Sequence, residues 1–227
     1  MPHPLDNPIW SSLTTAHSHL AAGEGEGAIK RYARDVAPFA AIDGQKQRQV
    51  NVSPSIVAAD ESINFVGPLP SLDSGWEIEL RAGVLQMIYP TVHISTERSA
   101  TFRELGEGDI ASMLTLTAKV FPGYFRQRTP VMGRYIGIFS SDELVAMAGE
   151  RMAMTGYTEI SAVCTHPDYA GRGYAGALVS TLAASISARG ITAFLHVSPE
   201  NQRAINLYRS LGFIERAELP LLRIRPT

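Results

Sequence analysis

The segment Gly171-Arg172-Gly173-Tyr174-Ala175-Gly176 constrains the fold of this 227-residue chain more than any other feature. Glycines let the backbone approach a ligand closely. The segment leads into a predicted helix from about Gly173 to Arg189, because the apolar residues there recur at helical spacing. Amide groups at a helix N-terminus bind phosphate oxygens. The segment therefore predicts a phosphate-binding loop, and the alternative is a tight turn without a ligand.

The same segment matches G-x-G-x-x-G, the pattern of dinucleotide-binding folds, but its position argues against that interpretation. In those folds the turn follows its strand directly, whereas here His166–Ala170 intervene after Thr165. An acidic residue is expected about 20 residues after the loop, and that position is His196. The remaining chain is also too short to complete a doubly wound sheet. We therefore reject a dinucleotide site.

Residues 101–227 alternate between predicted strands and predicted helices. The predicted order is strand, helix, hairpin, strand, helix, strand, helix, strand, which indicates an α/β (α+β) fold with a mixed central sheet flanked by helices. In chain order, the predicted elements are Phe102–Leu105, Ile110–Thr117, Tyr135–Phe139 with Leu144–Met154, Thr158–Thr165, the helix to Arg189, Thr192–Val197, a helix capped by Asn201, and closing strands Phe213–Ala217 and Leu221–Ile224.

Residues 1–100 predict a smaller α/β domain, with Ser95–Ala100 as the linker to a second domain at 101–227. We expect helices over Pro8–Leu20 and Ala28–Phe39. A hairpin is expected from Trp76–Leu80 and Val84–Tyr89, turning at Arg81-Ala82-Gly83. This part contains no recognisable catalytic constellation.

The composition excludes several classes of function. The net charge of -2 gives no basis for binding nucleic acid or an anionic membrane. No apolar run is long enough to span a bilayer, and the N-terminus lacks a signal-peptide pattern, so we expect a cytoplasmic protein without a membrane partner. Cys164 is the only cysteine, and no cluster has metal-ligand spacing, so neither a disulfide nor a metal site is expected.

Three motifs in fixed order resemble the GNAT superfamily of acyl-CoA N-acyltransferases. They are the stretch from Glu159 to Leu178 with the glycine loop, the segment Phe194–Asn201, and the segment Ala204–Phe213. The resemblance covers about residues 101–227. It implies an N-acetyltransferase that transfers an acetyl group from acetyl-CoA directly to a primary amine. The family loop has a long polar residue where this chain has Ala170, so the affinity for the coenzyme is in question.

The resemblance also implies residues that bind the coenzyme. Two adjacent parallel strands splay apart in this family, and the pantetheine arm pairs with the exposed edge of one of them. That edge would be Val163-Cys164-Thr165, and a backbone N–H near Thr165 would polarise the thioester carbonyl. The pyrophosphate would bind Gly171, Arg172, Gly173, Tyr174, Ala175 and Gly176, with a further contact from Asn201.

By resemblance, Tyr208 occupies the position of the general acid of the family. A phenol is protonated at neutral pH and can donate to a thiolate, so its chemistry suits this role. Glu159 matches a glutamate that serves as general base, and we expect partial burial to raise its pKa. Strand alternation predicts that Glu159, Ser161, Val163 and Thr165 share one face. Glu150 and His196 are further candidates for the base. Without the resemblance, Tyr208 reads as a packing residue and Glu159 as a solvated strand end.

The acceptor amine, on a small molecule or a peptide, cannot be read from the sequence. The loops Pro122–Arg128 and Met152–Tyr157 are expected near it, and their tyrosines either line a pocket or pack against residues 1–100. One interpretation of residues 1–100 is a degenerate second copy of the same fold, by analogy with two-domain relatives. A homodimer is compatible with the sequence. The alternative function is a catalytically idle acyl-CoA-binding module.

Overall fold

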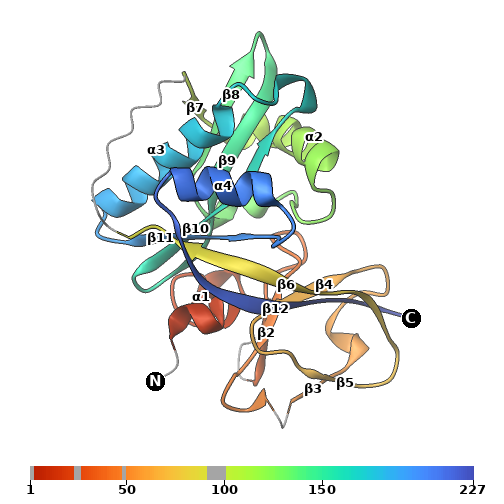
Figure 1. Cartoon of the computed structure of the whole chain (residues 1–227). Helices are drawn as coiled ribbons and strands as arrows, with labels where there is room; N and C mark the ends of the chain where they lie inside the picture. Colours follow the sequence, from red (N-terminus) through yellow and green to blue (C-terminus); the bar gives the residue numbers. More distant parts are fainter. Residues whose placement is uncertain (1–2, 23–26, 48–49, 91–100) are drawn as a thin grey trace.

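The computed structural model describes residues 3–22, 27–47, 50–90 and 101–227, and the predicted linker Ser95–Ala100 lies outside them. An eight-stranded sheet, in the order β4-β12-β6-β11-β10-β9-β8-β7, forms the centre of the molecule (Figure 1). Its strands are β4 (Ile63–Val66), β6 (Trp76–Ile88), β7 (Arg103–Glu104), β8 (Tyr135–Ser140), β9 (Glu143–Met154), β10 (Tyr157–Thr165), β11 (Thr192–Val197) and β12 (Ile214–Pro226).

The sheet is mixed, as predicted. Within the described residues, β10 and β11 form its one parallel pair, and the other neighbours are antiparallel. Strands β4 and β6 come from the first hundred residues and join the same sheet as the strands of 101–227. Residues 1–100 and 101–227 therefore share one sheet. Whether each range folds as a domain of its own stays a prediction. Two small sheets pair β1 (Ile29–Arg31) with β2 (Ala40–Ile42) and β3 (Asn51–Val52) with β5 (Ser71–Leu72).

Helices cover both faces of the sheet (Figure 1). On one face, α3 (Tyr174–Ala188) and α4 (Gln202–Ser210) share a buried cluster with strand residues such as Val197. On the other face, α1 (Pro8–Leu13) packs in a cluster with Phe194, and α2 (Ile110–Val120) packs in a cluster with Cys164. The N-terminal segment therefore lies over the face opposite α3.

Several expected elements differ in the structure. The predicted turn at Arg81-Ala82-Gly83 is wrong, because β6 continues through it with β12 paired alongside. Gly83 lies within this continuous strand and pairs with Pro220 of β12. The two predicted closing strands are likewise one strand, β12. Tertiary pairing overrides local turn signals in both cases.

Two predicted helices in the first hundred residues also differ. The helix expected over Pro8–Leu20 ends at Leu13, and a separate 3₁₀ turn follows at Ser18–Leu20. The helix expected over Ala28–Phe39 is wrong, because Ile29–Arg31 is strand β1 and pairs with β2. Strand pairing has outweighed the weak helix preference of this segment.

Candidate active site

The glycine loop has the backbone conformation that its composition predicts. Gly171 and Gly173 have φ angles of 83° and 80°, in the left-handed region that L side chains rarely adopt. An added Cβ at either position would meet no protein atom, so the loop borders open space. Gly173 is the N-cap of α3, and the first amides of this helix therefore lack intrahelical partners. This end of α3 can accept an anion.

Arg172 and Ala170 lie exposed in the same loop. The Arg172 guanidinium stacks over the Tyr169 ring, 4.6 Å from its centroid, which holds one positive charge beside the glycines. Tyr174 and Ala175 are half-buried in the first turn of α3, and Gly176 is buried against the sheet. The loop thus lacks the expected polar side chain at position 170 but has a positioned arginine two residues later.

Strands β10 and β11 separate after a short paired stretch. Their parallel pairing runs from Tyr157 with Thr192 to Glu159 with Phe194, although β10 continues to Thr165 and β11 to Val197. The His166 amide donates to the Val145 carbonyl of β9 at 2.8 Å. Because donors alternate along an antiparallel ladder, the Thr165 amide points away from β9 and toward the opening. The opening can therefore receive an extended ligand that pairs with the edge of β10.

A bulge interrupts β10 just beyond the paired stretch. Ala162 has a φ of 52°, and the register with β9 shifts between Ser161 and Cys164. The extra residue reverses the alternation of side chains. Val163 consequently packs with the α3 cluster and Cys164 with the α2 cluster. The prediction that Glu159 and Val163 share a face is therefore wrong.

Cys164 is buried, and burial raises the pKa of its thiol to about 12. A thiol in this state is a weak nucleophile, so it is poorly suited to carry an acetyl group as a covalent intermediate. The same alternation that turns the Thr165 amide toward the opening turns the backbone of Cys164 toward Met147 of β9, so the proposed pairing of Cys164 with the coenzyme stays a prediction.

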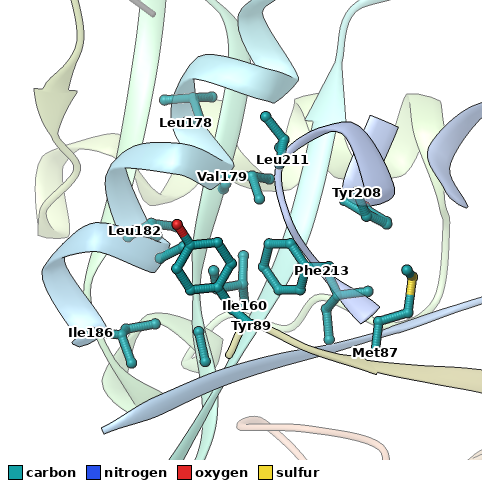
Figure 2. Close-up of a cluster of buried hydrophobic side chains, with 14 of the residues drawn as sticks. Met87, Tyr89, Ile160, Leu178, Val179, Leu182, Ile186, Tyr208, Leu211 and Phe213 are labelled. Carbon is teal, nitrogen blue, oxygen red and sulfur yellow. The ribbon is translucent and has the colours of Figure 1, made fainter. Parts of the chain in front are cut away.

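Tyr208 lies on the buried side of α4, beside Phe213 and near Met87 (Figure 2). Its ring is 6.0 Å from that of Phe213, and the same cluster includes Val163 and Val197 from the two separating strands. Burial raises the pKa of Tyr208 to about 12, so the phenol keeps its proton at neutral pH. Asn201 caps α4, with its side-chain oxygen accepting from the Ala204 amide at 3.1 Å.

Glu159 is fully buried and both of its carboxylate oxygens are occupied. Arg151 donates to Oε2 from Nε at 2.7 Å and to Oε1 from Nη2 at 2.6 Å, and His196 Nδ1 lies 2.7 Å from Oε1. Burial alone would raise its pKa, but the charge and hydrogen bonds of Arg151 and the contact with His196 outweigh it and lower the pKa to about 2. The expected upward shift is therefore wrong, because the buried arginine was not anticipated.

The sequence reasoning missed Arg151 and Gln86, two polar residues that hold the other candidates in place. Gln86 stands alone in an apolar strand segment and Arg151 follows Glu150 in another, and a charge or amide in such a position indicates a buried partner. Gln86 lies directly across from His196 in the β6–β11 pairing, with its Nε2 at 3.0 Å from the histidine Nε2. Glu150, the remaining candidate base, accepts from Arg189 Nη2 at 2.7 Å.

The loop aromatics pack against the N-terminal segment. Tyr124 stacks on Phe39 with 6.3 Å between ring centroids, and the Tyr157 hydroxyl lies 3.1 Å from His3 Nε2. Of the two interpretations left open for these tyrosines, the structure favours packing. An open pocket of about 390 Å³ is nevertheless bordered by the predicted acceptor loop, with lining residues Arg34, Asp35, Asp60, Glu61, Arg126 and Gln127.

Within residues 3–22, 27–47, 50–90 and 101–227, no helix is long and apolar enough to cross a membrane. No group of three or more His, Cys, Asp or Glu side chains in these ranges is placed to hold a metal ion.

A solved structure from Novosphingobium aromaticivorans, described as a candidate acetyltransferase of the GNAT family, is 33% identical in sequence to this chain. That match covers 100% of both chains with a TM-score of 0.87. The chain belongs to the GNAT family. The FR47-like protein family, in addition, matches residues 135–220 of this GNAT chain.

More distant structures share the GNAT fold. A GCN5-related N-acetyltransferase from Kribbella flavida is 17% identical, with a TM-score of 0.56 over 96% of this chain and 92% of its own. A GNAT-family acetyltransferase from Colwellia psychrerythraea is 10% identical, with a TM-score of 0.55 over 99% of this chain and 98% of its own. No match was found among curated proteins. The GNAT fold therefore extends over the whole chain, including β4 and β6.

Proposed function

We propose that this GNAT protein is an N-acetyltransferase that transfers an acetyl group from acetyl-CoA directly to a primary amine. The observation that carries this proposal is the opening between β10 and β11, which has the left-handed glycine loop near the end of β10 and Tyr208 on its α3 side. Such an opening fits a ligand that is extended at one end and anionic at the other. Coenzyme A has both properties, with a pantetheine arm and a pyrophosphate.

Each group has a distinct role in the proposed reaction. The amides at the start of α3 and the Arg172 guanidinium bind the pyrophosphate. The edge of β10 pairs with the pantetheine arm, and the Thr165 amide polarises the thioester carbonyl as a fixed dipole. The neutral amine nitrogen attacks the carbonyl carbon, the C–S bond breaks, and the departing thiolate takes a proton from the Tyr208 hydroxyl. The nitrogen releases its extra proton to water, and Tyr208 regains a proton from solvent.

The test is release of free coenzyme thiol from acetyl-CoA by the purified chain, with and without a panel of primary amines. We expect thiol release that depends on the added amine, with an acetylated amine of the corresponding mass as product. Binding of acetyl-CoA without acetylation of any amine would instead support a catalytically idle coenzyme-binding module. Thermal stabilisation by NAD in preference to acetyl-CoA would contradict both.

Replacing Gly173 by valine should weaken coenzyme binding. A β-branched residue disfavours a φ of 80°, with a strain of about 1–2 kcal/mol, and its side chain would occupy the space beside the helix amides. We expect the KM for acetyl-CoA to rise on the order of tenfold or more. The matched control is Gly190→Val, because Gly190 has a φ of 72° at the other end of α3. The control should lose similar thermal stability with an unchanged KM, and an equal rise of KM in both variants would contradict the assignment.

A further inference from the structure

Every buried carboxylate in the described part of the chain is paired with an arginine. The pairs are Glu61 with Arg31 at 2.5 Å, Glu150 with Arg189 at 2.7 Å and Glu159 with Arg151 at 2.6 Å. For Glu159, the charge and hydrogen bonds of Arg151 and the contact with His196 outweigh burial and lower the pKa to about 2, so its carboxylate is a poor acceptor for a further proton. Glu61 and Glu150 each accept a hydrogen bond from their arginine.

The neighbours of His196 indicate which of its two ring nitrogens accepts a hydrogen bond. Gln86 Nε2 donates to the Leu5 carbonyl at 3.0 Å, and Gln86 Oε1 accepts from Arg216 Nη1 at 2.9 Å. These two bonds set the orientation of the amide, so the group that faces His196 Nε2 at 3.0 Å is a donor. An amide NH₂ cannot accept a hydrogen bond, so Nε2 must be the accepting nitrogen. The ring proton consequently lies on Nδ1 and is donated to Glu159.

This arrangement also prevents relay of a proton to the surface. The hydrogen-bonded chain continues from Gln86 through Arg216 to Asp6, whose side chain is about half exposed. The amide and the guanidinium in this chain are donors that do not exchange protons at neutral pH. The remaining titratable groups that interact with Glu159 are the phenols of Tyr32 and Tyr135, whose pKa values are raised by burial. Among the described residues that contact or interact with Glu159, none is thus placed to act as a base or a relay.

We infer that the acceptor enters the site as the free amine, and that the substrate class is amines that are substantially uncharged near neutral pH, such as the α-amino groups of peptides or amino-acid amides. The inference rests on the proposed acetyl transfer. After attack, the nitrogen of the addition product is acidic enough to release its extra proton to water. The thiolate is protonated by Tyr208, which regains a proton from solvent, so the overall reaction yields one amide and one free thiol.

The expected preference follows from the neutral fraction of each amine. An α-amino group has a pKa of about 7.7–8.0 and a lysine side chain about 10.4. At about pH 7.5, roughly a third of the former and about 0.1% of the latter are uncharged. At comparable affinity and intrinsic reactivity, the α-amine should have a kcat/KM larger by on the order of 10².

The experiment compares two acceptors, alanine amide and Nα-acetyl-lysine methylamide, by thiol release from about pH 6 to about pH 10. We expect kcat/KM for each acceptor to rise with pH and to level off near the pKa of that acceptor's own amine. If kcat/KM levels off at the same pH for both acceptors, or if the two kcat/KM values are equal near neutral pH, the protein supplies a base and the inference is overturned. Failure of both amines to stimulate thiol release would count against the proposed function itself.

A second measurement needs no substrate. Long-range ¹H–¹⁵N NMR spectra report the tautomer of each histidine, and His196 is assigned by the signal lost in His196→Asn. We expect the neutral Nδ1–H tautomer at about pH 7. In Gln86→Glu, the new carboxylate can accept from Nε2, so the same ring should become doubly protonated. An imidazolium or an Nε2–H tautomer in the unmodified chain would show that Gln86 does not hold Nε2 as an acceptor, which would contradict the hydrogen-bond chain on which the inference rests.

Discussion

Replacement of Tyr208 by phenylalanine is expected to lower kcat by on the order of 10²–10⁴ while leaving the KM for acetyl-CoA nearly unchanged. The hydroxyl donates only when the thiolate departs, so its loss affects the transition state more than coenzyme binding. The ring itself remains, and its contact with Phe213 is kept, so the variant should fold normally. The measurement is amine-dependent thiol release, accompanied by a thermal melt of each variant.

The matched control is Tyr89→Phe. Tyr89 is buried in the same cluster, with its ring 5.2 Å from that of Phe213 on the side facing α3 (Figure 2). This control should keep its activity, because Tyr89 has no proposed part in the reaction. Since burial raises the pKa of Tyr208 to about 12, the unmodified enzyme should also show no loss of kcat up to about pH 10. Unchanged turnover in Tyr208→Phe would remove this residue from the mechanism.

Replacement of Glu159 by glutamine is expected to lower the free energy of unfolding by about 3–5 kcal/mol. The change leaves the Arg151 guanidinium buried without its counter-charge. For a chain of this size, the melting temperature should fall by roughly 6–20 °C. Glu215→Gln is the control for an exposed pair, because Glu215 and its partner Arg209 are about half exposed and should contribute at most about 1 kcal/mol.

The double variant Glu159→Gln/Arg151→Met separates a structural role of Glu159 from a catalytic one. Removing both charges together should recover most of the lost stability, because no buried charge is left uncompensated. If Glu159 only positions its neighbours, the double variant should keep kcat within about tenfold of the original. A stable double variant that has lost nearly all turnover would indicate that Glu159 is the general base after all.

The pH dependence of stability offers an independent check on the same pair. The pKa of Glu159 is lowered from 4.5 to about 2 in the folded chain, so the pair contributes fully above about pH 4.5. That contribution is lost as the pH falls from about 4.5 toward about 2, because the unfolded chain takes up the proton first. The difference in melting temperature between the Glu159→Gln variant and the original should therefore narrow in acid, whereas a constant difference would contradict the assignment.

Local signals were sufficient to predict the parts of the site that depend on neighbouring residues. The glycine loop, the α3 helix behind it and the Asn201 cap of α4 each arise within a short stretch of chain, so their pattern is visible in the sequence. The hairpin of β8 and β9 and the order of strands and helices after residue 101 were predictable for the same reason. The resemblance to the GNAT superfamily rests on these segments, and the full-length relative confirmed it.

The environment of Glu159 could not be predicted, because it depends on residues far apart in the sequence. Its partners come from β9 and β11, and His196 is held in turn by Gln86 of β6, from the first hundred residues. The bulge at Ala162 was also hidden, since its sequence is compatible with a regular strand and only the pairing with β9 reveals the shift. Both features changed the interpretation of the chemistry.

The sequence by itself determined that this chain has a glycine loop before a long helix within a mixed α/β fold, and it supplied Tyr208 as the candidate acid. Glycine freedom, helix periodicity and capping act over a few residues, so those conclusions needed no tertiary information. Only the tertiary structure revealed that Glu159 is buried between Arg151 and His196, and that Gln86 lies beside the other nitrogen of the histidine. Ionisation inside a protein depends on which buried charges and donors lie within a few ångströms of a group. Here the packing of four strands and the N-terminal segment sets the distances from Glu159 and His196 to their partners.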